Sequence, residues 1–172
     1  MNIVIKLISS VMIIASCAGM GIKHALKLKC RFRCLLDIKN AFVILESEIS
    51  FASNKLSKAV QNASAGTGNE VCSFLTELSE SISRMGAKHA WEQCLSQNRQ
   101  NLCLTNSDMQ ILLPLGSELG TTDTSNQIRT LRHITALTDV QCTQARLDYE
   151  RNAKMYAGIS LLLGLAVVIV LF

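Results

Sequence analysis

Proline and aromatic residues are scarce in this chain, and each scarcity excludes a class of structure. Pro114 is the single proline in 172 residues, and there are only nine glycines, so turns should be few and helices favoured throughout. Aromatic residues make up 5% of the sequence. That content argues against a β-sandwich, a stacking platform for single-stranded nucleic acid and an aromatic ligand cage. We therefore expect an all-α protein.

The sequence also lacks the motifs that usually carry chemistry. It has no phosphate-binding loop, no dinucleotide-binding glycine fingerprint, no nucleophile-elbow serine and no zinc-protease helix. Its histidines, His24, His89 and His133, are scattered, and neither a histidine nor a second cysteine pair has zinc spacing around Cys30 and Cys34. We predict no catalytic residue, no metal and no cofactor, which leaves an interaction module rather than an enzyme.

Two apolar segments bracket the chain. Residues 3–22 carry one charge, Lys6, and residues 155–172 carry none. A helix of about 20 apolar residues spans the core of a bilayer, and a slightly shorter one suffices if it stands nearly upright. The sequence therefore predicts transmembrane helices at 1–22 and 155–172, with a single domain at 23–154 between them.

Basic residues gather beside both apolar segments, on the side of the intervening domain. They are Lys23, Lys27, Lys29, Arg31, Arg33 and Lys39 after the first, and Arg146, Arg151 and Lys154 before the second. The positive-inside rule then places the domain in the cytoplasm and both termini outside. These cations should also meet anionic lipid headgroups, at about 1 kcal/mol each near the surface. Residues 40–145 carry more acids than bases, so the domain offers no basic patch for nucleic acid.

The seven cysteines leave two alternatives open. Six lie beyond the first apolar segment and could be free thiols in a reducing cytoplasm or three disulfides in an oxidising space. The run Ile14-Ala15-Ser16-Cys17 resembles a bacterial lipobox, which would make the protein an extracytoplasmic lipoprotein anchored at Cys17. The cations that follow the segment oppose such a translocation.

Apolar periodicity predicts an antiparallel bundle of about six helices. The expected elements are a continuation of the first helix over 24–52 with an interruption at Ser53-Asn54, then helices at 55–62, from Asn69 to Gly86, at 88–97 and from Ser107 to about 119, and a last helix from about 124 into the membrane. We expect Pro114 to kink the fifth helix. On the last helix, the predicted apolar face comprises Ile128, Leu131, Ile134, Leu137, Val140 and Ala145.

A corner before the last helix is the most distinctive local pattern. It reads Leu115-Gly116-x-x-Leu119-Gly120-x-x-Asp123. Gly120 should adopt a positive φ and stop the fifth helix, and Asp123 should cap the last one. The corner is either a structural turn, which we favour, or a surface that faces a partner.

Three stretches resemble the stage III sporulation protein AB family of endospore-forming bacteria. They are Leu45-Glu46-Ser47-Glu48-Ile49-Ser50-Phe51 with Leu56 and Ala59, the corner with Asp108 and Gln127 around it, and Lys154-Met155-Tyr156 leading into residues 164–172. The order and spacing of these stretches and the two anchors extend the resemblance over essentially the whole length. The chain departs from the family at Asn54 or Lys55, where a proline is usual, and at Ile159-Ser160, where Leu-Gly is usual.

The resemblance implies a function in sporulation. Family members carry a helical domain similar to the cytoplasmic domains of the type II secretion inner-membrane F protein. They work beside a secretion-type ATPase, stage III sporulation protein AA, in a channel between mother cell and forespore. By that resemblance the chain would be a non-catalytic, two-pass platform in the outer forespore membrane, facing the mother-cell cytoplasm. It would bind the ATPase and other membrane proteins of the complex. A general membrane tether is an alternative, and self-association into a homo-oligomer stays open.

Overall fold

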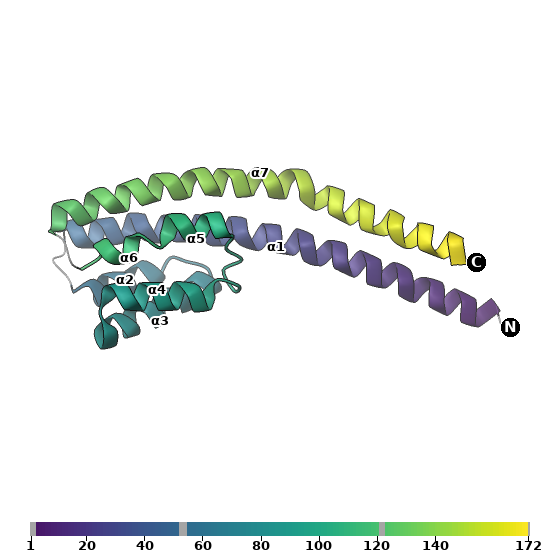
Figure 1. Cartoon of the computed structure of the whole chain (residues 1–172), viewed down its shortest axis with the longest axis horizontal. Helices are drawn as coiled ribbons and strands as arrows, with labels where there is room; N and C mark the ends of the chain where they lie inside the picture. Colours follow the sequence, from purple (N-terminus) through teal and green to yellow (C-terminus); the bar gives the residue numbers. More distant parts are fainter. Residues whose placement is uncertain (1–2, 52–54, 121–122, 172) are drawn as a thin grey trace. The chain divides into compact units, whose positions relative to one another are not determined.

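The computed structural model describes the backbone of residues 3–51, 55–120 and 123–171. Within these ranges the chain is helical and has no strand, so the all-α prediction is confirmed. The helices are α1 (Ile3–Phe51), α2 (Leu56–Ser64), α3 (Asn69–Met85), α4 (Ala87–Asn98), α5 (Asn106–Leu112), α6 (Leu115–Glu118) and α7 (Thr124–Leu171) (Figure 1). The interruption predicted at Ser53-Asn54 lies outside the described residues.

The chain divides into two compact units. The first comprises Met1–Lys29 and Ala145–Phe172, and the second comprises Cys30–Gln144. The predicted domain at 23–154 therefore contains the whole second unit, while its outermost residues belong to the first.

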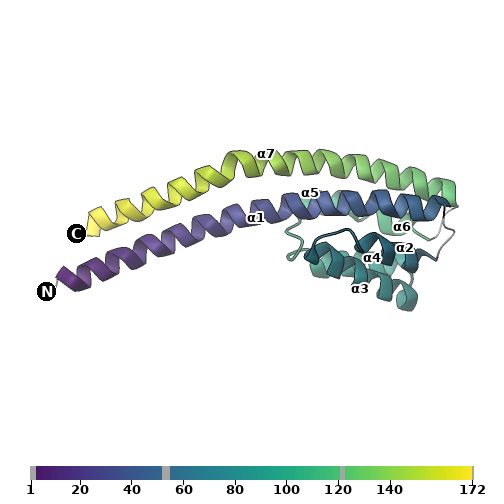
Figure 2. The same cartoon turned by 180° about the vertical axis from the view of Figure 1, so that it is seen from behind.

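In the second unit, α1 and α7 run antiparallel (Figures 1 and 2). Lys39 Nζ lies 2.8 Å from Asp139 Oδ1, and Arg132 Nε lies 2.6 Å from Glu46 Oε1. The residue numbers rise along α1 as they fall along α7, which defines the antiparallel sense. These ion pairs are partly exposed, so they fix the register of the two helices more than they stabilise the fold.

The core of the second unit is built around Trp91. Trp91 is 2% exposed, and its ring centroid lies 5.8 Å from that of Phe74 on α3 and 6.2 Å from that of Phe42 on α1. Its indole N–H donates to the carbonyl of Leu112, at 2.9 Å. A buried indole needs such an acceptor. This side chain therefore joins four helices, α1, α3, α4 and α5.

The buried face of α7 differs from the predicted one. Leu131, Ile134 and Ala145 are buried as expected, but Leu137 is 37% exposed and Val140 is 65% exposed. Thr138 and Cys142 are buried in their place. Residues 131, 134, 138, 142 and 145 recur at spacings of three and four, so helical geometry selects this stripe. Thr138 tolerates burial because its hydroxyl donates to the carbonyl of Ile134.

Pro114 divides the predicted fifth helix instead of kinking it. Helix α5 ends at Leu112 and α6 begins at Leu115. Proline has no N–H to donate to the preceding turn. The hydrogen bonds here span three residues instead of the four of an α-helix. They run from the Gly116 amide to the Leu113 carbonyl and from the Ser117 amide to the Pro114 carbonyl, both at 3.2 Å.

Helix α3 starts at Asn69, as predicted, and α5 starts at Asn106, one residue before the predicted Ser107, and each helix is capped by the residue before its start. Gly68, not Asn69, is the N-cap of α3, and its amide donates to Asp37 Oδ2 at 3.1 Å. Thr105, not Ser107, is the N-cap of α5, where it forms a capping box with Asp108. In each case a side chain or a tertiary contact satisfies an amide at the helix start.

One helix among the described residues is long and apolar enough to cross a membrane, the part of α7 from Thr124 to Ile169. Residues 3–11 are helical, but their side chains lie outside the description. A membrane crossing by the first segment therefore stays a prediction.

Candidate functional site

The corner before α7 is packed into the core. Leu115 and Leu119 are 0% and 1% exposed, and Gly116 is also buried. A Cβ on Gly116 would lie 2.7 Å from Trp91 Cδ1 and 2.9 Å from Trp91 Cβ. Glycine is required because the indole occupies the space of a side chain. These three residues are therefore inaccessible to a partner, and they form a structural turn.

The two exposed members of the corner end one helix and start the next. Gly120 has φ 77°, which confirms the predicted positive value. Asp123 Oδ1 accepts from the amide of Asn126 at 2.7 Å, and the Asp123 carbonyl accepts from Gln127 at 3.0 Å. Asp123 is therefore the predicted N-cap of α7.

A groove beside the corner offers an accessible surface that the sequence did not indicate. It lies between α5–α6 and α7 and has a volume of about 500 Å³. Its apolar lining comprises Ile111, Pro114, Ile134 and Leu137, and its polar lining comprises Gln110, Ser117, Glu118, Asn126, Arg129, Thr130 and His133. Val140, one turn beyond Leu137, extends the exposed apolar surface. We call this surface the α6/α7 groove.

Arg31 occupies a buried ion pair. Its Nε and Nη2 atoms each donate to an Asp108 carboxylate oxygen at 2.9 Å, and Nη2 also donates to Gln141 at 3.2 Å. The side chains of Arg31 and Asp108 are 11% and 0% exposed. The prediction that Arg31 meets lipid headgroups is therefore wrong, because its guanidinium points into the second unit and not toward solvent.

Asp108 has further hydrogen bonds that stabilise its charged form. Its carboxylate accepts from the amide and the hydroxyl of Thr105, both at 2.8 Å. Burial acts to raise the pKa of Asp108, but the hydrogen bonds from Arg31 and Thr105 outweigh it and hold the pKa below its ordinary value. This network was not predicted from the sequence, although Thr105-x-x-Asp108 has the spacing of a capping box.

The other basic residues beside the apolar segments are mostly exposed. Lys23, Lys27, Arg33 and Arg151 are exposed and Lys29 is half-buried, while the side chain of Lys154 lies outside the description. Lys39, by contrast, is paired with Asp139, and the hydrogen bond from Asp139 raises the pKa of Lys39. The juxtamembrane basic cluster is therefore smaller than the sequence alone suggests.

In the first unit, α1 and α7 approach closely through small residues. A Cβ on Gly21 would lie 2.8 Å from Tyr156 O, and one on Gly164 would lie 3.2 Å from Ile14 Cα and from Cys17 Cβ. Such small residues are common where apolar helices pack in membranes.

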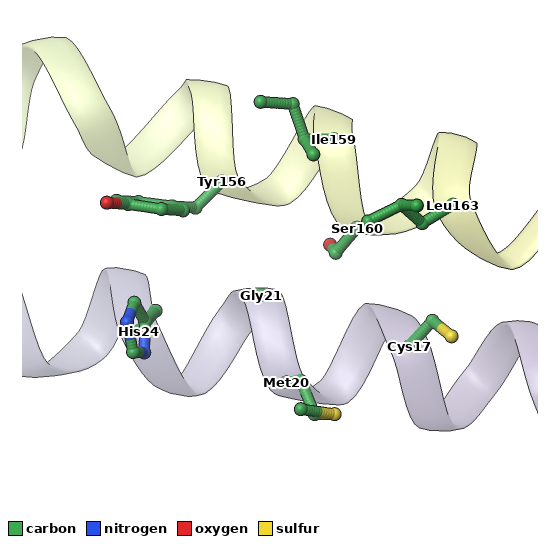
Figure 3. Close-up of a pocket in the computed structure, with 8 residues that line it drawn as sticks. All are labelled: Cys17, Met20, Gly21, His24, Tyr156, Ile159, Ser160 and Leu163. Carbon is green, nitrogen blue, oxygen red and sulfur yellow. The ribbon is translucent and has the colours of Figure 1, made fainter.

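A crevice of about 300 Å³ opens beside these contacts (Figure 3). It is lined by Cys17, Met20, Gly21, His24, Tyr156, Ile159, Ser160 and Leu163. We call it the α1/α7 crevice.

The seven cysteines, all within the described residues, form no disulfide with one another. Cys30 Sγ lies 4.0 Å from Cys34 Sγ, and burial, with a contribution from Cys30, raises the pKa of Cys34. Since the thiolate is the reactive form, Cys34 is a poor nucleophile. Among the described residues, no three His, Cys, Asp or Glu side chains converge as metal ligands.

Fold and site together define an all-α protein whose described residues line two accessible surface features, the α6/α7 groove and the α1/α7 crevice. Comparison with protein families identifies the family: the model of stage III sporulation protein AB matches residues 6–172. The chain belongs to the stage III sporulation protein AB family, as its sequence motifs predicted. No curated protein and no solved structure shows a significant match to the chain.

Proposed function

We propose that this stage III sporulation protein is a non-catalytic membrane platform. In this proposal the ends of α1 and α7 cross the membrane as a pair, with the second unit in the mother-cell cytoplasm. The platform couples a secretion-type ATPase, stage III sporulation protein AA, to the other membrane proteins of a channel between mother cell and forespore. The partners and the channel come from what the family resemblance implies.

The close contact between the apolar ends of α1 and α7 is the main observation in support of the proposed membrane anchoring. Without a hydrophobic driving force between them, helices in lipid associate by tight packing, which small residues permit. Gly21 and Gly164 supply that packing, since a Cβ on either would press against the opposite helix. The exposed cations Lys23, Lys27 and Arg151 would then lie at the anionic cytoplasmic surface.

The α6/α7 groove is the surface we assign to the ATPase. Three of the five corner residues, Leu115, Gly116 and Leu119, cannot contact a partner because they are buried. The groove combines an apolar lining with Arg129 and His133, which lie one helical turn apart on α7. An amphipathic helix with an acidic side chain among its apolar residues would fit this combination.

Co-purification from sporulating cells tests the assignment. Arg129→Glu reverses a charge on the groove and should reduce recovery of the ATPase with the tagged full chain at least five-fold. Lys88→Glu is the matched control, because Lys88 is exposed on α4 and does not line the groove. It should leave recovery unchanged.

Two outcomes would count against the proposal. Equal recovery of the ATPase with wild type and Arg129→Glu would remove the groove as its binding surface. Nucleotide hydrolysis by the purified chain alone would overturn the non-catalytic platform itself.

A further inference from the structure

We propose that the α1/α7 crevice binds one anionic glycerophospholipid, with an acyl chain along the crevice and the phosphate at Lys23 and Lys27. The inference rests on the membrane anchoring proposed above and adds a specific ligand to it. All residues involved belong to the first unit.

The lining of the crevice suits a hydrocarbon chain. Met20, Ile159 and Leu163 contribute apolar side chains, and the space beside them measures about 300 Å³. From Cys17 to His24 the crevice follows two turns of α1, roughly 10 Å at 1.5 Å per residue. A headgroup would find little to bind along this length, whereas an acyl chain would bury its surface.

One end of the crevice is polar. His24 and Tyr156 meet there edge to face, with ring centroids 5.2 Å apart and planes at 76°. Figure 3 shows the Tyr156 hydroxyl directed toward this end, beside His24, while Leu163 and Cys17 lie at the other end. Tyrosine is common at the headgroup level of membranes, where its ring is apolar and its hydroxyl is wet. The rings therefore mark where the ester and phosphate groups of a lipid would emerge.

Two cations continue the crevice beyond that polar end. Lys27 follows the lining residue His24 by three positions on α1, so it lies one turn beyond the polar end, and Lys23 lies one turn before Lys27. Both lysines are exposed, and the described residues include no ion-pair partner for either. A phosphate at the mouth would complement both charges, which favours an anionic lipid over a zwitterionic one.

Lipid titration of the delipidated full chain tests the site. The chain is held in a non-ionic detergent, and bound lipid is counted by native mass spectrometry with phosphatidylglycerol or with phosphatidylcholine of the same acyl chains. We expect one phosphatidylglycerol to bind at concentrations where phosphatidylcholine does not. Lys27→Gln should weaken this binding about five-fold, which corresponds to the roughly 1 kcal/mol contribution of one cation.

Matched variants separate the site from general surface charge. Lys29→Gln removes the same charge two residues away, on a different face of α1, and should weaken binding less than two-fold. Leu163→Trp fills the crevice and should abolish binding, whereas Leu162→Trp adds the same ring at an exposed position outside it and should leave binding intact. Circular dichroism confirms that each variant keeps its helices.

Three results would contradict the proposed lipid site. They are equal binding of the two lipids to wild type, equal weakening of phosphatidylglycerol binding in Lys27→Gln and Lys29→Gln, and unchanged phosphatidylglycerol binding in Leu163→Trp. Alkaline carbonate extraction of membranes distinguishes these failures from a failure of the anchoring. A chain that stays in the membrane without selecting phosphatidylglycerol lacks the lipid site but keeps its anchor. A chain released by carbonate refutes the anchoring proposal itself.

Discussion

At the scale of single residues, the buried carboxylate of Asp108 joins α5 to α1 within the second unit. Its carboxylate is fully buried and receives hydrogen bonds from α1, through Arg31, and from its own helix cap, through Thr105. A buried ion pair adds little net stability over an apolar pair, but removing one partner leaves the other buried and uncompensated. Asp108 therefore fixes where α5 sits on α1.

Asp108→Asn should lower the free energy of unfolding by about 3 kcal/mol at pH 7. Because the folded-state pKa of Asp108 is lowered, its contribution is complete above the ordinary Asp pKa of about 3.9 and is lost as the pH falls through the folded-state pKa. Wild type should therefore lose stability below about pH 4 more steeply than the variant. Urea unfolding of the full chain in non-ionic detergent, followed by fluorescence of the buried Trp91, measures both effects.

Asp139→Asn is the control for this experiment. It breaks the Lys39 pair, whose side chains are 28% and 59% exposed, and should cost at most about 1 kcal/mol. Similar losses for the two variants would mean that the Arg31–Asp108 pair behaves as a surface contact.

At the scale of the helices, the boundaries are set by single residues with special backbone properties. Pro114 separates α5 from α6, Gly120 allows the turn after α6, and Asp123 caps α7. Gly116 lets α6 lie directly on Trp91. The corner between α6 and α7 thus depends on backbone conformation and close packing more than on ionisable groups.

Gly120→Ala should cost about 1–2 kcal/mol, since an L-residue resists the left-handed conformation that Gly120 adopts at φ 77°. Gly66→Ala makes the same chemical change at a site where a Cβ would meet only Ile44 Cδ1, at 3.7 Å. It should change stability by less than about 0.5 kcal/mol. Unfolding monitored by Trp91 compares the two, and an equal effect would show that the conformation of Gly120 is not essential to the turn.

At the scale of the whole molecule, the cysteines report which side of the membrane the second unit occupies. Cys72 and Cys103 are partly exposed, whereas Cys94 is buried and cannot serve as a probe. Exposed cations near both apolar segments favour the cytoplasm for this unit, because translocating them is costly.

An impermeant maleimide should therefore leave Cys72 and Cys103 unlabelled in intact protoplasts and label them after lysis. Mass spectrometry of tryptic peptides identifies the modified thiols. Labelling in intact cells would place the unit outside and favour the lipoprotein alternative. We expect wild type and a Cys17→Ser chain to have the same electrophoretic mobility, because Cys17 is not lipidated. A mobility difference between them would support the lipoprotein alternative.

The sequence by itself determined the helical class, the cap at Asp123 and the turn at Gly120, because each depends on composition, periodicity or local backbone chemistry. The family followed from the resemblance of three sequence stretches to its known members. Only the tertiary structure decided which residues face the core and which remain available. On α7, Thr138 and Cys142 occupy the buried face in place of Leu137 and Val140. Helix geometry, and not hydrophobicity alone, selects which residues face the core. Arg31 belongs to an internal ion pair, and not to the lipid surface, because Asp108 lies 77 positions away in sequence but 2.9 Å away in space. The α6/α7 groove and the α1/α7 crevice also arise where helices distant in sequence pack together, and no local sequence pattern predicts such packing.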